Sequence, residues 1–187
     1  MSTEQIISGY LLYALIPLWL LTGLLDWMCH RASRIETTSG VPESAIHLAL
    51  FAEAGIALLC GLYLEITASA LLIMIGAWVM HEVTGYWDFR LATGLRTITP
   101  FEQRVHDYMA AIPFAALSLV AILHWSQAAA LLGFGPETAD FSIRLKDTPL
   151  SLEYRIGLPL AVILLNAIPY AEEFTRCWRA RTRLKTA

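Results

Sequence analysis

The sequence has little charge for its length. Aspartate, glutamate, lysine and arginine make up 16% of its 187 residues, whereas about 25% is usual for a soluble globular domain. Hydrophobic residues reach 57%, against a usual share of about 45–50%. This balance excludes a disordered chain, a nucleic-acid-binding tail and an ordinary cytosolic domain. The composition therefore predicts a protein most of which lies in lipid.

Cysteine is scarce as well. The three cysteines, Cys29, Cys60 and Cys177, are far apart and lie in apolar runs. An odd number at such spacing favours neither a disulfide framework nor a CxxC metal motif. We interpret them as small buried apolar side chains, so that no set of thiolates competes as metal ligands.

Long apolar runs, in contrast, are abundant. A transmembrane helix needs roughly 20 mostly apolar residues. Five runs meet this requirement: residues 6–29, 44–64, 66–88, 105–125 and 156–174. A single helix over the second and third runs would be about 67 Å long, more than twice the hydrocarbon thickness, so we expect a turn at Glu65. The predicted fold is all-α, a single domain over residues 1–187 with five transmembrane helices, the first four forming an antiparallel bundle.

Basic residues indicate the orientation. Ten of the thirteen lysines and arginines lie in the loops after the first and third runs and in the tail, residues 175–187. The positive-inside rule then places the N-terminus outside and the C-terminus in the cytoplasm, and we expect a bacterial inner membrane. The outer loop, residues 126–154, has alternating apolar patterns at 141–145 and 150–154, which fit either a short β-hairpin or an irregular loop.

Ionisable side chains inside the spans are functional candidates, because each costs about 2.5–3.5 kcal/mol on insertion scales. Three spans carry a carboxylate and a histidine four residues apart, on one helix face. These pairs are Asp26 and His30, Glu43 and His47, and Glu102 and His106. In the third span His81 and Asp88, seven residues apart, also share a face. Because alternate spans run in opposite directions, all four sets are expected at the cytoplasmic end of the bundle.

Helix rise divides these residues into two layers, about 6 Å apart. The deeper layer contains Asp26, His47, His81 and His106, and the layer nearer the cytoplasm contains His30, Glu43 and Glu102, with Asp88 slightly lower. Carboxylates and imidazoles that converge inside a four-helix bundle bind paired metal ions. We therefore expect these residues to hold two metal ions, with iron as the first choice and zinc or manganese as alternatives.

Each group also has an ordinary structural explanation. Glu102 could complete a capping box at the start of its helix, and Glu43 could interact with the helix dipole. Asp26 and His30 could extend to the interface, and a lone His81 could be an ordinary bundle histidine. We favour a metal site because these explanations are independent of one another, whereas all the groups fall at one end.

Other polar residues have less definite roles. Glu53 lies deeper and on another face, so it could support a ligand, relay protons or simply pair with a neighbouring hydroxyl group. Glu82 could also handle protons or replace Asp88 as a ligand. The arginines of the inner loops fit positive-inside topology and contact with anionic lipid. Alternatively, some of them could hold an anionic headgroup while its apolar tail lies between helices. The candidates for this are Arg90, Arg96 and Arg104. Glu172 and Glu173 are expected to pair with the basic tail or to approach the site.

The (D/E)xxxH pairs resemble, at the level of motif, the membrane-bound di-iron oxygenases and desaturases and, more distantly, ferritin-type carboxylate bundles. The resemblance covers only the polar ends of four helices. The chain has no HxxxH or HxxHH box and no ExxH pair, so its spacing is its own.

Three functions are compatible with this pattern. The leading hypothesis is a di-iron oxidoreductase that oxidises a lipid or other lipophilic molecule, with Glu53 or Glu82 handling protons and an electron donor as partner. A zinc hydrolase of a lipid-like ester or amide is the alternative. A haem b electron-transfer subunit ranks third, because a haem needs no acid beside each histidine. A metal transporter fits poorly, since the outer half of the bundle has almost no polar path except Glu53.

Overall fold

The computed structural model describes residues 1–186, most of which are helical. The helices are α1 (Thr3–Tyr10), α2 (Ile16–Ser33), α3 (Gly40–Tyr63), α4 (Ala68–Leu95), α5 (Pro100–Leu123), α6 (Trp125–Leu131), α7 (Leu152–Val162) and α8 (Ile168–Thr186). The π-helical turns Leu11–Leu15 and Ile163–Ala167 join α1 to α2 and α7 to α8, and the 3₁₀ turn Ile35–Thr37 precedes α3. Five helical segments within the described residues are long and apolar enough to cross a membrane, which confirms that prediction.

The segments differ from the expected spans mainly at their ends. The first runs over Thr3–Ser33 and the third over Ala68–Leu95, so both extend beyond their apolar runs. The connection from α4 to α5 is short because Pro100 occupies the first turn of α5 and Thr99 caps it. The expected turn at Glu65 is present between α3 and α4. The tail continues α8, and residue 187 lies outside the described part.

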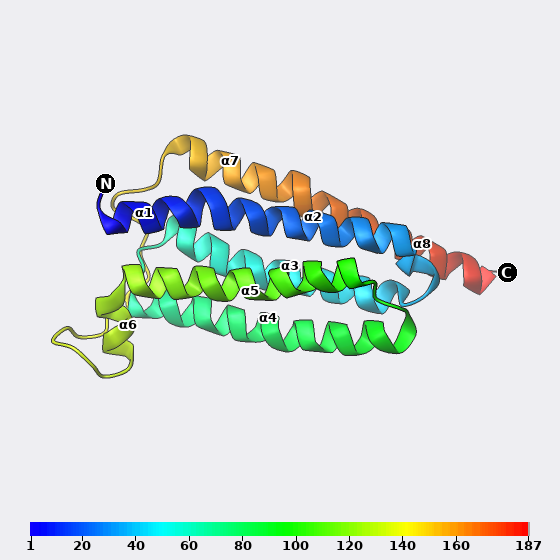
Figure 1. The fold of residues 1–187 in the computed structure, drawn as a ribbon, viewed down its shortest axis with the longest axis horizontal. Helices are drawn as coiled ribbons and strands as arrows, with labels where there is room; N and C mark the ends of the chain where they lie inside the picture. The colour runs from blue at the N-terminus through cyan, green and yellow to red at the C-terminus, as the bar shows by residue number, and fades with distance from the viewer. Residues whose placement is uncertain (187) are drawn as a thin grey trace.

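The helices lie side by side along one axis (Figure 1). α2 packs against α5, α3 against α4, and α8 against both α3 and α2. The fifth span, which was expected to lie outside the group formed by the first four, therefore packs against the first and second spans. Asn166 donates a hydrogen bond to the Leu20 carbonyl at 3.1 Å and so ties the fifth span to the first. Gly23 permits this approach, because a Cβ there would lie 2.6 Å from the Asn166 amide nitrogen.

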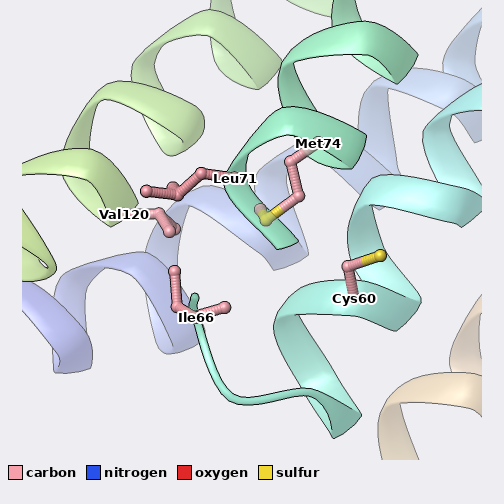
Figure 2. Close-up of a cluster of buried hydrophobic side chains, with 5 residues drawn as sticks. All are labelled: Cys60, Ile66, Leu71, Met74 and Val120. Atoms are coloured by element: carbon pink, nitrogen blue, oxygen red, sulfur yellow. The ribbon is translucent and has the colours of Figure 1, made fainter. Parts of the chain in front are cut away.

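Apolar packing is concentrated at the end where α3 turns into α4. Figure 2 shows this cluster, with Cys60 from α3, Ile66 from the turn, Leu71 and Met74 from α4, and Val120 from α5. A second apolar cluster joins α2, α3 and α7. The opposite end, where α2 turns into α3 and α4 into α5 (Figure 1), we call the polar end. The bundle thus has an apolar half and a half in which buried polar groups collect.

The outer loop does not form the β-hairpin that was one of its two expected structures, since the described residues contain no strand. Leu145 instead makes an isolated antiparallel bridge with Leu64. Backbone hydrogen bonds of 2.9 and 3.0 Å on either side of it join the loop to the turn between α3 and α4. That turn has backbone groups that no helix satisfies, so the loop pairs with the turn and not with itself.

Candidate metal centre

Acidic and histidine side chains gather inside the polar end. We call them the acid–histidine cluster; its members are Asp26, His30, Glu43, His47, Asp88, Glu102, His106 and Glu173. All of them except His106 are buried, and the His106 side chain is 19% exposed. The cluster contains every expected ligand except His81.

Helix geometry brings the first two acid–histidine pairs together. His30 Nε2 lies 3.4 Å from Asp26 Oδ1 on α2, and His47 Nε2 lies 3.9 Å from Glu43 Oε1 on α3. In each pair the acid and the histidine lie one turn apart on the same face of their helix. Because α2 and α3 are consecutive and run in opposite directions, the two pairs meet: His30 Nε2 is 4.0 Å from Glu43 Oε1.

The third pair, on α5, completes this side of the cluster. Glu102 uses one oxygen for its helix cap, where Oε2 accepts from the Thr99 backbone nitrogen at 3.4 Å. Its other oxygen, Oε1, lies 3.5 Å from His30 Nε2. One turn further on, His106 Nε2 is 2.8 Å from Asp26 Oδ1. The capping explanation for Glu102 is therefore compatible with a role in the site.

Glu173 holds the two central histidines. Its Oε2 lies 3.0 Å from His30 Nδ1 and its Oε1 lies 2.7 Å from His47 Nδ1. The two imidazole rings stack with their centroids 4.4 Å apart and their planes 6° apart. An ionised carboxylate can only accept, so both Nδ1 atoms donate to it, and neutral rings then carry a lone pair on each Nε2. Carboxylates orient metal-binding histidines in this way.

Several buried polar atoms of the cluster lack a hydrogen bond. His30 Nε2, His47 Nε2 and Asp88 Oδ1 have no such partner among the described residues, although His47 Nε2 and Asp88 Oδ1 are only 3.4 Å apart. Burying such an atom without a hydrogen bond costs about 1–3 kcal/mol of folding free energy. Nitrogen and oxygen ligands at about 2.0–2.2 Å from one ion lie about 2.9–3.5 Å from each other. Separations of 3.4–3.5 Å within the cluster fall in this range.

Two groups of three ligand atoms satisfy the distance requirement for a shared ion. One comes from Asp26, His30 and His106, and the other from His30, Glu43 and His47. Within each group the ligand atoms lie within 4.8 Å of one another. Both groups include His30, and its Nδ1 is already engaged by Glu173, so its Nε2 can complete only one of them; the other would need a further ligand, such as Asp88 beside His47.

Arg96 is the cation of the cluster, and it does not face lipid. Its side chain is 3% exposed, and its Nη2 lies 2.5 Å from Glu43 Oε1 and 2.6 Å from Glu102 Oε1. Burial alone would lower the pKa of Arg96, but its hydrogen bonds to the two glutamates raise the pKa above the ordinary value. The guanidinium is therefore charged, and it is not available for the headgroup contact that the sequence left open.

His81 lies apart from the cluster. Its Nδ1 donates to the Leu50 carbonyl at 3.2 Å and is 3.9 Å from Glu53 Oε2. By helix rise His81 is about 10 Å deeper than Asp88, and Asp88 is the residue that reaches His47. His81 therefore does not belong to the deeper layer in which it was expected, together with Asp26, His47 and His106.

The other predicted site residues also lie outside the cluster. Glu53 is buried, with one oxygen accepting a 2.8 Å hydrogen bond from a threonine of α4 and the other without a partner in residues 1–186. Glu82 is exposed, so Asp88 is the α4 carboxylate that faces the histidines. Arg90 and Arg104 are exposed as well, and Arg104 pairs with a neighbouring aspartate at 3.3 Å.

Tyr170 of α8 is a site residue that the sequence pattern does not single out, whereas Glu173 was expected, with Glu172, either to pair with the basic tail or to approach the site. The Tyr170 hydroxyl lies 3.3 Å from Asp26 Oδ2. Glu172, the neighbour of Glu173, instead binds Arg31 at 2.7 Å on the outside of the bundle. Adjacent helix positions are about 100° apart, so only one of the two glutamates can face inward. The only signal in the sequence was the presence of two carboxylates at the inner end of the fifth span.

A cavity of 340 Å³ adjoins the cluster. Asp26, His47, Asp88 and His106 form part of its wall, and much of the rest is apolar. Small-molecule sites usually have volumes of about 300–1,000 Å³. A ligand in this cavity would reach the cluster from an apolar environment.

Comparison with known proteins adds no assignment: no protein-family model matches the chain, and neither a curated protein nor a solved structure matches it. Function must therefore be inferred from the cluster and its cavity.

Proposed function

We propose that the chain is a membrane-embedded di-metal oxidoreductase, with iron as the metal, which oxidises a lipophilic substrate at the cytoplasmic side of a bacterial inner membrane. One observation carries the proposal. The two central histidines, His30 and His47, each donate a hydrogen bond from Nδ1 to Glu173. Their Nε2 atoms face buried carboxylates but form no hydrogen bond within the described chain. A protonated Nε2 would approach a carboxylate to about 2.7–3.2 Å, yet the separations are 3.4 Å or more. A cation between these atoms accounts for both features.

The charge balance of the cluster favours two ions. Five buried carboxylates, those of Asp26, Glu43, Asp88, Glu102 and Glu173, face one buried guanidinium. With neutral imidazoles this leaves a charge of −4. A buried charge without compensation costs several kcal/mol. Two divalent cations would neutralise the cluster, whereas one would leave half of the excess.

The ligands divide between the two ions by position. Asp26, His30 and His106 would hold one ion, and Glu43 and His47 the other. Asp88 joins the second group through its contact with His47. Glu102, which lies 3.5 Å from His30 Nε2 and shares the Arg96 guanidinium with Glu43, would be a further ligand of this centre.

The reaction that we propose is hydroxylation of an unactivated C–H bond. Two iron ions would supply the activation of dioxygen. One oxygen atom enters the C–H bond and the other leaves as water, which consumes two protons and two electrons, and an electron-donor protein supplies the electrons. Tyr170 and Glu173 keep the ligands in place, and the apolar cavity excludes bulk water. Glu53, with its unpartnered oxygen near His81, and the more exposed Glu82 are the candidates for proton handling.

The orientation that we propose rests on the basic residues around the polar end. Arg31, Arg90 and Arg104 are exposed there, as expected for contact with the anionic lipids of a cytoplasmic leaflet. The N-terminus would then be outside and the C-terminus in the cytoplasm. The polar end, with the buried cluster inside it, would then lie on the side of the membrane that a soluble electron donor can approach.

Metal analysis of the full chain tests the proposal. Protein purified in detergent, loaded anaerobically with Fe(II) and desalted should retain two iron ions per chain and absorb in the near ultraviolet after exposure to oxygen. His47→Ala should lose both ions. His124→Ala is the matched control and should keep both, because His124 lies at the opposite end of the bundle. Wild-type protein that retains no iron, or metal-free protein that is active, would overturn the proposal.

The spectrum also separates the alternatives. Retention of colourless zinc in preference to iron would overturn the iron assignment in favour of a zinc hydrolase, in which the metal would supply hydroxide for the hydrolysis of an ester or amide. A Soret band would favour haem b. The stacking of His30 and His47 at 4.4 Å leaves no space for a porphyrin between these two rings.

A further inference from the structure

A second cavity continues the first toward the apolar end of the bundle. It has a volume of 200 Å³, and its wall shares Trp19, Ala54, Leu58 and His81 with the cavity at the cluster. The two cavities therefore adjoin at the level of His81, and we call the two together the channel. Along α3 their walls run from His47 to Leu62, a length of about 22 Å by helix rise.

The shape and lining of this channel suit a single extended hydrocarbon chain. The second cavity is bounded mainly by apolar residues of α2, α3, α4 and α5, such as Ile16, Met74 and Leu117. Its polar wall residues include Glu53 and His81, which lie close to each other where this cavity adjoins the first. An extended chain advances about 1.25 Å per carbon, for a carbon–carbon bond of about 1.5 Å. A channel of about 22 Å thus matches a chain of about 16 to 18 carbons.

The two ends of the channel carry opposite charge. At the apolar end the wall includes Lys146, His124 and Tyr154. Lys146 is half-buried, its backbone nitrogen is fixed by a 2.9 Å hydrogen bond to Tyr63 O, and it forms no ion pair within the described residues. Burial lowers the pKa of Lys146, and the nearby Glu65 carboxylate raises it only in part. A bound anion would further offset the cost of keeping the ammonium charged. At the other end, the carboxylates of the cluster repel an anion.

We infer that the channel binds one unbranched fatty acid, with its carboxylate at Lys146 and its methyl end at the acid–histidine cluster. The charge of each end sets this direction, and the length of the channel sets the chain length. The inference rests on the proposed function only for its chemical consequence, which is that oxidation falls at or near the terminal carbon. Binding itself requires only the channel and Lys146.

Binding of labelled fatty acids to the purified full chain in amphipol tests the inference, with stearate, decanoate and octadecan-1-ol as probes. Wild-type protein should bind stearate at least tenfold more tightly than octadecan-1-ol, which has the same chain but no charge. Lys146→Gln should lose this tenfold advantage and keep its affinity for the alcohol. The matched control is Arg144→Gln, which removes an exposed cation two residues away and should bind stearate normally.

A second pair of variants tests the channel. Ala54→Phe places a ring where the two cavities meet, and decanoate, about 12 Å long from its bond length, should still fit the segment beside Lys146. We expect at least a tenfold loss of stearate affinity with decanoate affinity unchanged, whereas a misfolded variant would lose both. Ala52→Phe, on the exposed face of the same helix, should bind both probes normally.

Either of two results would overturn the inference: stearate affinity that is insensitive to Lys146→Gln, or equal binding of stearate by Ala54→Phe and wild type. The first result, together with a tightly retained diacyl phospholipid, would place a bilayer lipid in the channel with its headgroup at the polar end. Metal content, measured on the same samples, separates this inference from the proposed function. Stearate binding without metal would leave the channel standing and refute the metal centre, and metal without stearate binding would do the reverse.

Discussion

Replacing Glu173 with glutamine tests whether this carboxylate prepares the two central histidines for metal. The carboxylate accepts from His30 Nδ1 at 3.0 Å and from His47 Nδ1 at 2.7 Å. Glutamine has one accepting oxygen and one NH₂ group, so it can accept from only one of the two rings. The other ring must turn or change tautomer, which places a proton on its Nε2 and removes a ligand atom.

The expected loss of metal affinity follows from comparable sites. Removing the partner that orients a metal-binding histidine typically weakens metal binding about 10–100-fold, which corresponds to about 1.4–2.8 kcal/mol. The assay is competition between the purified variant and a chelator of known affinity. Thermal unfolding of the metal-free protein should change little, because glutamine keeps one hydrogen bond and removes one buried negative charge.

Glu172→Gln is the matched control. Glu172 is the adjacent residue, but its side chain is 38% exposed and pairs with Arg31 and Arg176 outside the cluster. Surface pairs of this kind contribute about 0–1 kcal/mol, and metal affinity should not change. If Glu173→Gln binds metal as tightly as wild type, then Glu173 does not orient the histidines, and their unpartnered Nε2 atoms need another explanation.

Three further variants test other parts of the site. Arg96→Gln should destabilise the metal-free protein by about 3–5 kcal/mol, because two buried glutamates lose their cation. Unfolding in detergent measures this loss, which should be smaller after metal loading. The control Arg104→Gln, at an exposed position, should change stability little. Thr99→Ala should lower the free energy of unfolding by about 1 kcal/mol, because the helix loses its cap. The control is Thr93→Ala, which removes an exposed hydroxyl from a helix interior. His81→Ala should retain both metal ions in the metal analysis, and loss of either would return His81 to the ligand set.

The helical framework could be predicted because its signals are local. Span length and hydropathy identify the five segments, and the length limit requires the turn at Glu65. The outer loop could not be predicted in the same way. Alternation of apolar residues indicates an extended strand but does not name its partner, and Leu145 pairs with Leu64 from a turn 81 residues earlier. Tertiary pairing of this kind is absent from any local pattern.

The cluster was only partly predictable, for a related reason. Spacing of four residues and alternating helix direction suffice to bring Asp26, His30, Glu43 and His47 to one place. The rotation of each helix about its own axis is a property of packing, and it decided the remaining choices. On α8 it turns Glu173 inward. On α4, where His81 and Asp88 share a face, the position of the helix along its axis decides instead: it brings Asp88 to His47 and leaves His81 deeper in the bundle.

The same charges that make a metal site plausible also make the metal-free protein strained. Five carboxylates share a buried volume with one guanidinium and three histidines that can take up protons, and any charge that stays unpaired there costs several kcal/mol. That total is comparable with the about 5–15 kcal/mol by which a typical protein is stable. Binding of cations would therefore contribute directly to folding. Arg96 keeps the metal-free cluster tolerable by pairing with two of its glutamates and offsetting one of their two charges, which explains why an arginine lies among residues otherwise suited to hold metal.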